Sequence, residues 1–222
     1  MNKFLNRTVW LVVIIPIIYL ALAWHSLPEK IAMHFDLQGN ADKFDSKKEF
    51  FWFIIIMLAV SVGIYLLVGN IWRIDPKKYA AENKGRLQKI AFTSVVFLAA
   101  IQCFVIYIGT QGSLKLNLRF FFAVAGIFWA VISNYMYNLK PNYFAGFRLP
   151  WTLENEENWR RTHRLAGKLW FAGGLLIAAI CIFTSTTIST ITLFSILTIV
   201  TVIPIVYSYR LYRKQKSLKP ID

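Results

Sequence analysis

The chain has 222 residues, of which 57% are hydrophobic, and its mean hydropathy is +0.50. Its apolar residues come in blocks long enough to cross a hydrocarbon core of about 30 Å. None of the blocks alternates as the strands of a membrane barrel do. These features exclude an ordinary water-soluble domain and predict an all-α, polytopic membrane helical bundle. The six predicted transmembrane helices cover residues 8–27, 50–72, 90–110, 120–139, 168–187 and 190–208.

The formal net charge of +14 is unevenly distributed between these spans. With a cytoplasmic N-terminus, 19 of the 25 Lys and Arg residues fall on the cytoplasmic side. Because positive residues mark that side, the sequence predicts a multi-pass protein of the bacterial cytoplasmic membrane with both termini cytoplasmic. Basic rims against anionic membrane lipids account for the charge. Direct binding to nucleic acid is therefore not expected.

Residues 1–23 allow two interpretations. Lys3 and Arg7 precede an apolar core and an Ala-Leu-Ala sequence, a pattern that also fits a cleaved secretory signal. A retained first span is favoured, because the apolar region is long for a signal core. Two units are then predicted, each with one long polar loop: residues 1–72 with an extracellular loop at 28–49, and residues 73–222 with a cytoplasmic loop at 140–167.

The extracellular loop is predicted to form a small hairpin. Ile31, Met33 and Phe35 alternate as in a short strand, and Gln38-Gly39-Asn40 has the composition of a turn. A hairpin at this position could contact a peptide or lipid headgroups on the outer face of the membrane.

Histidine and aspartate residues in and near this loop raise the question of a metal site. No two histidines have the HxH or HxxxH spacing of metal ligands, so neither a metal nor another cofactor is expected. Instead, His34 is expected to form a hydrogen bond within the hairpin, and Asp42 to close a turn. The residues considered as ligands are His25, His34, Asp36, Asp42 and Asp45.

Further along the chain, Gly63 and Gly69 in the second span predict close helix packing.

Residues 73–89 are rich in lysine and are interpreted as a solvated, lipid-facing charged segment rather than a docking site. Cys103 and Cys181 fall within apolar spans, which favours a role as small buried side chains.

A polar, aromatic and arginine-rich insert occupies residues 134–170. Pro141 ends the preceding helix, because proline cannot continue the hydrogen-bond ladder. Thr152 is a candidate N-cap for a short cytoplasmic interfacial helix that continues into the next apolar segment. The residues on one stripe of that helix are Trp159, Thr162, His163, Ala166 and Trp170.

Residues 142–153, followed by Trp159, Thr162-His163-Arg164 and Gly167, resemble the signature of the SdpI-like family of bacterial membrane proteins. Two positions, Phe147 and Leu149, depart from the isoleucine and threonine usual in that signature. The Leu-Pro, His-Phe, Gly, Asp and Lys residues of 27–43 resemble the small domain of unknown function that opens many members of the same family.

The resemblance implies an immunity protein that confers resistance to a secreted antimicrobial peptide toxin. For the best-studied kind it also implies signal transduction, in which the membrane protein captures a cytoplasmic winged-helix repressor. The implied cytoplasmic partner surface comprises Asn134, Asn142, Gly146, Arg148, Pro150, Trp151, Thr152, Trp159, Thr162, His163, Arg164 and Gly167. The implied extracellular surface that contacts the toxin comprises Pro28, His34, Phe35, Gly39 and Asp42.

Catalytic residues and enzyme activity are not predicted. No span carries an Asp or Glu at its centre, so a carboxylate-based proton relay lacks its usual parts. His163 is placed in the cytoplasm while both cysteines lie at lipid depth, so a Cys-His pair cannot be assembled.

Three other interpretations remain open. A membrane transporter or lipid-handling protein would have a polar cavity reaching the membrane midplane. A hydrolase using the outer His and Asp residues would hold zinc. The signature residues could also be structural, forming a loop held by aromatic anchors and by an arginine bonded to backbone carbonyls.

Overall fold

The computed structural model describes residues 3–36, 40–112 and 118–217, with side chains from residue 6 onward. Within these residues, six helices are long and apolar enough to cross a membrane, which confirms the all-α polytopic bundle. A small antiparallel hairpin, β1 Lys30–Phe35 with β2 Ala41–Ser46, follows the first helix. The long helices are α1 Lys3–Ala23, α2 Lys47–Asn70, α3 Ala80–Gln111, α4 Leu118–Met136, α6 Glu156–Phe183 and α7 Thr186–Ser217.

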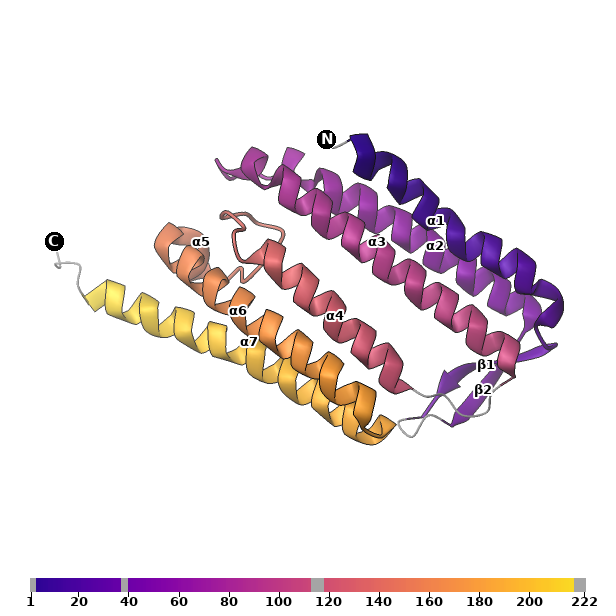
Figure 1. Cartoon of the computed structure of the whole chain (residues 1–222). Helices are drawn as coiled ribbons and strands as arrows, with labels where there is room; N and C mark the ends of the chain where they lie inside the picture. The colour runs from indigo at the N-terminus through magenta and orange to yellow at the C-terminus, as the bar shows by residue number, and fades with distance from the viewer. Residues whose placement is uncertain (1–2, 37–39, 113–117, 218–222) are drawn as a thin grey trace.

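Successive long helices run in opposite directions, so their connections lie at two ends of the bundle (Figure 1). The hairpin end carries β1, β2 and the connection from α6 to α7. The signature end carries the connection from α2 to α3 and the loop between α4 and α6. The start of α1 and the end of α7 also lie there. His34 in β1 and Arg148 in the loop therefore lie at opposite ends of the bundle.

The helices form two sets that meet where α3 contacts α4. In one set α3 packs along α1 and α2, and in the other α6 packs along α4 and α7. The predicted division of the chain at residue 72 stays a prediction. A buried apolar cluster joins α3, α4 and α6 at the signature end and consists of Leu87, Ile132, Met136, Leu139 and Trp159.

Helices α4 and α6 approach each other closely at a pair of glycines. A Cβ atom added to Gly126 would lie 2.5 Å from the Gly174 carbonyl oxygen, and one added to Gly174 would lie 2.5 Å from the Gly126 oxygen. Two facing glycines thus bring the helix backbones into contact, as is common in membrane bundles. The prediction of close packing at Gly63 is wrong, since no atom lies within 4 Å of a Cβ placed there. At Gly69 the nearest atom is the Ala91 Cβ, at 3.9 Å.

Two helices begin earlier than their apolar sequences suggested. The third span starts at Ala80 rather than near residue 90, and the fifth starts at Glu156 rather than near residue 168. Each extension buries one side, including Asn83 and Leu87 in α3, and exposes charged side chains on the other. Hydropathy averaged along the sequence misses such amphipathic turns.

The interfacial helix is divided into two parts. Thr152 lies inside a short helix, α5 Pro150–Glu154, so its predicted role as N-cap is wrong. The cap of α6 is Asn155, whose side-chain oxygen accepts a hydrogen bond from the Asn158 N–H at 2.9 Å. From there α6 continues without a break into the apolar segment, which confirms that part of the prediction.

Candidate functional site

The loop between α4 and α5 is built around the buried side chain of Asn142. Its Oδ1 accepts hydrogen bonds from the N–H groups of Phe144 and Ala145, at 2.9 and 2.7 Å. Its Nδ2 donates to the carbonyl oxygens of Lys140 and Ala145, at 3.0 and 3.1 Å. All the hydrogen-bonding groups of this amide are thus used within the loop. Asn142 fixes the loop's shape and has no group left for a partner.

His163 is completely buried beneath the same loop. Its Nε2 accepts a hydrogen bond from the Phe147 N–H at 3.1 Å, and its Nδ1 lies 2.9 Å from the Trp159 carbonyl oxygen. Because Nε2 is an acceptor, the ring is the neutral tautomer with its proton on Nδ1. Its ring stacks on Trp159 with centroids 4.0 Å apart. His163 therefore connects the loop to α6.

Gly146 permits this contact between the loop and His163. Its φ of +104° lies in the region that favours glycine, and a Cβ atom there would overlap the His163 Nε2. Thr152 completes the arrangement: its hydroxyl donates to the Phe147 carbonyl oxygen at 2.5 Å and accepts from the Leu149 N–H at 3.0 Å. Gly146 and the Thr152 hydroxyl thus stabilise the conformation of the loop.

Hydrogen bonds from Trp151 of α5 and Asn158 of α6 attach these helices to α7. The Trp151 indole N–H donates to the Ser208 hydroxyl at 3.0 Å, and the Asn158 side chain donates to the Ser208 carbonyl oxygen at 3.0 Å. The Thr162 hydroxyl lies 3.1 Å from Asn158 Oδ1, one turn away on α6. Asn158 and Ser208 were not predicted. The spacing of Asn158 from Thr162 places both on one helix face and could have indicated the first.

The predicted cytoplasmic surface therefore separates into a buried group and an exposed group. Arg148 is exposed, and its Nη1 donates to the Tyr143 carbonyl oxygen at 2.9 Å, as the structural interpretation of the loop expects. The buried residues are Asn142, Thr152, Trp159, Thr162, His163 and Gly167. The partly exposed residues are Gly146 and Trp151, and the exposed ones are Asn134, Arg148, Pro150 and Arg164.

Residues 73–89 do not form the purely lipid-facing segment that was predicted, because they dock on the signature region. Asn83 is fully buried; its Nδ2 donates to the Lys140 carbonyl oxygen at 3.1 Å and its Oδ1 accepts from the Lys140 N–H at 2.9 Å. Lys78 pairs with Glu156 at 2.8 Å, and this hydrogen bond raises the pKa of the lysine. Charge composition alone did not reveal these partners, which are more than 50 residues away in the sequence.

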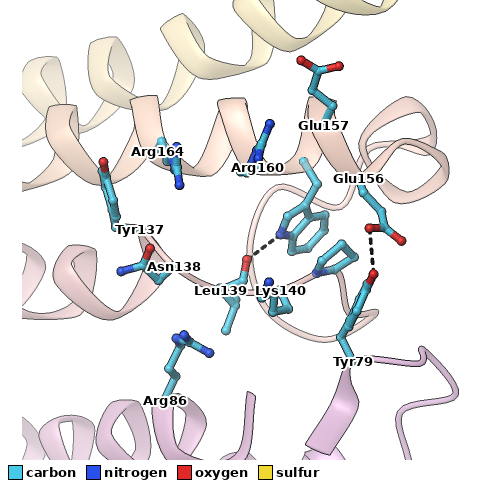
Figure 2. Close-up of a pocket in the computed structure, with 12 residues that line it drawn as sticks. Tyr79, Arg86, Tyr137, Asn138, Leu139, Lys140, Glu156, Glu157, Arg160 and Arg164 are labelled. Carbon is cyan, nitrogen blue, oxygen red and sulfur yellow. Dashed lines mark hydrogen bonds between the residues drawn. The ribbon is translucent and has the colours of Figure 1, made fainter. Parts of the chain in front are cut away.

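A pocket of about 490 Å³ lies between these docked segments. Figure 2 shows Arg86 on α3 and Arg164 on α6 extending toward the space between their helices. We call it the basic pocket, since four cationic side chains line it against two carboxylates. Its lining residues are Tyr79, Arg86, Tyr137, Asn138, Leu139, Lys140, Pro141, Glu156, Glu157, Trp159, Arg160 and Arg164.

At the other end of the bundle, the hairpin is confirmed. Exposed His34 and Asp42 lie on neighbouring strands, with Nδ1 and Oδ1 2.6 Å apart, so the predicted hydrogen bond of His34 is present. The prediction that Asp42 closes a turn is wrong. Asp36 takes that role, because its Oδ1 accepts from the Asn40 N–H at 2.8 Å. Gly39 lies outside the described residues.

The hairpin is held against the bundle by one apolar face. Leu27 and Ile31 are buried and belong to a cluster with Phe50 of α2 and Ile106 of α3. Pro28 and Phe35 are partly buried, while His34 and Asp42 remain exposed. The ligand-type residues of the described chain do not assemble into a group of three that could hold a metal.

A transporter would have a polar cavity at the membrane midplane, so the buried polar groups between α2 and α3 are relevant to that alternative. Ser61 and Gln102 are both buried, and the Gln102 amide donates to the Ser61 hydroxyl at 3.1 Å. The Ser61 hydroxyl donates in turn to the Met57 carbonyl oxygen at 2.8 Å. The Gln102 amide nitrogen also donates to the Leu98 carbonyl oxygen at 3.3 Å, whereas its Oε1 is buried without a hydrogen-bond partner among the described residues. Neither side chain lines the basic pocket.

Six apolar helices with a packed hairpin at one end and an ordered polar loop at the other define a multi-pass membrane protein. Residues 138–208 match the model of the SdpI/YfhL protein family, and residues 11–58 match a domain of unknown function, DUF1648. The chain is thus similar to the SdpI-like family over its signature-bearing part and to this domain over its hairpin-bearing part. A curated relative, Immunity protein SdpI of Bacillus subtilis (strain 168), is 27% identical over 169 residues, covering 75% of this chain and 76% of the relative. No solved structure matches the chain.

Proposed function

We propose that this chain is an immunity protein of the bacterial cytoplasmic membrane that protects its cell against a secreted antimicrobial peptide. The observation that carries the proposal is the similarity to an immunity protein over three quarters of the chain. That similarity comes with family matches in both the hairpin-bearing and the signature-bearing parts.

The proposed orientation places the signature end and both termini in the cytoplasm and the hairpin end outside. The distribution of positive residues supports it, since cytoplasmic loops carry an excess of Lys and Arg. Lys77, Lys78, Lys140, Arg148 and Arg160 all lie at the signature end, in the α2 to α3 connection, the loop or the first turns of α6.

On this orientation the exposed side of the hairpin is the surface that contacts the toxin. His34 and Asp42 form its polar part, and the partly buried Phe35 and Pro28 form its apolar border. The packing of Ile31 against Phe50 and Ile106 supports the idea, because it holds the hairpin in a fixed position.

The signature end is the proposed docking surface for a cytoplasmic winged-helix repressor. Its exposed Arg148, Pro150 and Arg164 are available to a partner, and arginine often contributes strongly to binding at interfaces. The buried residues, such as Asn142 and His163, support that surface from below. Immunity and repressor capture use opposite ends of the bundle, so one can exist without the other.

Deleting the gene and challenging the cells with candidate secreted peptides tests the proposed function. The deletion strain is expected to be killed by at least one peptide that the wild-type strain survives, and the intact gene should restore survival. His34→Ala should restore survival poorly. This variant should retain its fold, because an exposed hydrogen bond of this kind contributes only about 1 kcal/mol or less. Arg148→Ala is the matched variant at the other end and should restore survival while weakening repressor capture.

Survival of the deletion strain at wild-type levels against every peptide would overturn the immunity proposal. Full protection by His34→Ala would remove the hairpin from the toxin surface and leave the immunity role standing. Membrane abundance of each variant is measured in parallel, so that loss of protein is not mistaken for loss of recognition.

A further inference from the structure

The basic pocket holds cationic side chains that the structure leaves without counter-charges. Of its two carboxylates, Glu156 pairs with Lys78 and accepts a hydrogen bond from Tyr79. Glu157 pairs with Arg161, which is not part of the lining. In the described part of the chain, no carboxylate forms a salt bridge with the three pocket arginines, which are Arg86, Arg160 and Arg164.

These arginines are positioned by rigid elements on both sides of the pocket. Arg86 comes from the second turn of α3 and donates to the Glu82 carbonyl oxygen at 3.1 Å, leaving other guanidinium N–H groups available. Arg164 lies against Tyr137, with its guanidinium carbon 5.9 Å from the ring centroid. Like charges gathered in one pocket repel each other, so an anion bound between them would be strongly favoured.

The chemistry of the pocket selects a phosphate group. Guanidinium groups bond to phosphate oxygens in pairs, and they retain their charge at any physiological pH. A pocket of about 490 Å³ is larger than a phosphate ion and has room for a phosphate with its attached headgroup. The hydroxyl-bearing rings of Tyr79 and Tyr137 and the Asn138 amide add uncharged hydrogen-bonding groups to the wall.

The position of the pocket points to membrane lipid as the source of that phosphate. It lies where α3 and α6 emerge from their apolar segments, close to the polar and aromatic residues of the signature end. Tyrosine and tryptophan gather at the headgroup level of membranes, and basic pockets between membrane helices bind anionic headgroups.

We propose that the basic pocket binds the phosphate of an anionic phospholipid, held between Arg86 of α3 and Arg160 and Arg164 of α6. A bound phosphate would join the two helix sets, because α3 belongs to one and α6 to the other. This site requires neither toxin nor repressor, although Arg164 also belongs to the proposed repressor surface, whereas Arg86 and Arg160 do not.

The test uses the purified full-length protein in uncharged detergent. Binding of short-chain phosphatidylglycerol, short-chain phosphatidylcholine and inorganic phosphate is followed by native mass spectrometry and by the shift in unfolding temperature. Phosphatidylglycerol is expected to bind and to raise the unfolding temperature, with phosphatidylcholine at least about tenfold weaker, or about 1.4 kcal/mol. Inorganic phosphate distinguishes a lipid site from a site for free phosphate: weaker binding than phosphatidylglycerol indicates lipid, and equal binding indicates that the phosphate alone is recognised.

Each of Arg86→Gln, Arg160→Gln and Arg164→Gln should weaken phosphatidylglycerol binding by about tenfold, the size expected for loss of one charge-assisted hydrogen-bonding group. Arg210→Gln is the matched control, because Arg210 is an exposed arginine on α7 outside the pocket lining and carries the same charge change. It should bind as the wild type does. The proposal would be overturned if Arg210→Gln weakened phosphatidylglycerol binding as much as the pocket variants do. It would also be overturned if the wild type bound phosphatidylcholine as well as it binds phosphatidylglycerol and phosphate.

Discussion

Replacing Gly174 by alanine is expected to destabilise the protein strongly. The added Cβ would lie 2.5 Å from the Gly126 carbonyl oxygen and 2.7 Å from the Ala130 backbone nitrogen. Both are backbone atoms of α4, so the overlap can be relieved only by moving the two helices apart. Overpacking of this kind costs about 2 to 3 kcal/mol. Thermal unfolding in detergent, with the yield of monodisperse protein, measures the loss.

Gly63→Ala is the matched control for Gly174→Ala. Both glycines lie within apolar helices, but no atom lies within 4 Å of a Cβ at position 63. Alanine has a higher helix propensity than glycine by about 1 kcal/mol, so this variant should be as stable as the wild type or slightly more stable. Equal effects of the two substitutions would contradict the assignment of the glycine contact between α4 and α6.

Replacing Gly146 by alanine is expected to disorder the signature loop. The φ of +104° is unfavourable for any residue with a Cβ, at a cost of roughly 1 to 3 kcal/mol. The Cβ would also overlap the His163 Nε2 and displace the buried Phe147 N–H from its acceptor, which costs about 1 to 3 kcal/mol more. Increased protease cleavage in the loop and a lowered unfolding temperature would report the change.

Two comparisons separate backbone strain from the overlap with His163. Gly112→Ala introduces a side chain in the left-handed helical region, at a φ of +57° with no atom within 4 Å, so it reports the smaller strain of that region without overlap and should be the milder variant. Combining Gly146→Ala with His163→Ala should destabilise less than the sum of the two single changes, because the second removes the overlapped ring. If the destabilisations of the two single variants add fully in the double variant, the loop does not contact the His163 imidazole as described.

The sequence was sufficient to predict the elements that depend on local patterns. Long apolar runs predicted six membrane helices, and the alternation of Ile31, Met33 and Phe35 predicted the hairpin. The stripe containing Trp159 and His163 predicted one face of the helix that became α6, and that face is buried. Each of these features is determined by residues that are close to one another in the sequence, so the local sequence pattern is enough to predict it.

Features that depend on residues distant in the sequence could not be predicted in the same way. Gly126 and Gly174 contact each other across two helices that are far apart in the sequence, so neither local sequence reveals its partner. The docking of Asn83 on Lys140 depends on the position of α3 against the loop, which charge composition does not reveal. For the same reason the basic pocket, formed by α3 and α6 together, was not predicted.

The structure also changes how the family signature is interpreted. Most of its polar members are used internally: Asn142 shapes the loop, His163 accepts from the loop backbone and Thr152 bonds to it. Substituting these residues would therefore impair any function of the signature end through loss of its shape. Tests of partner binding are cleaner on exposed residues such as Arg148, with the order of the loop checked because the Arg148 Nη1 donates to the Tyr143 carbonyl oxygen.

The central claim is that the hairpin lies outside the cell and the signature loop lies in the cytoplasm, and single-cysteine labelling in intact cells tests it most directly. Cys103 and Cys181 are first replaced by alanine, and then His34→Cys or Arg148→Cys is introduced. A membrane-impermeant maleimide should label position 34 in intact cells and position 148 only after the membrane is permeabilised. Labelling of both positions in intact cells, or of position 148 alone, would contradict the account.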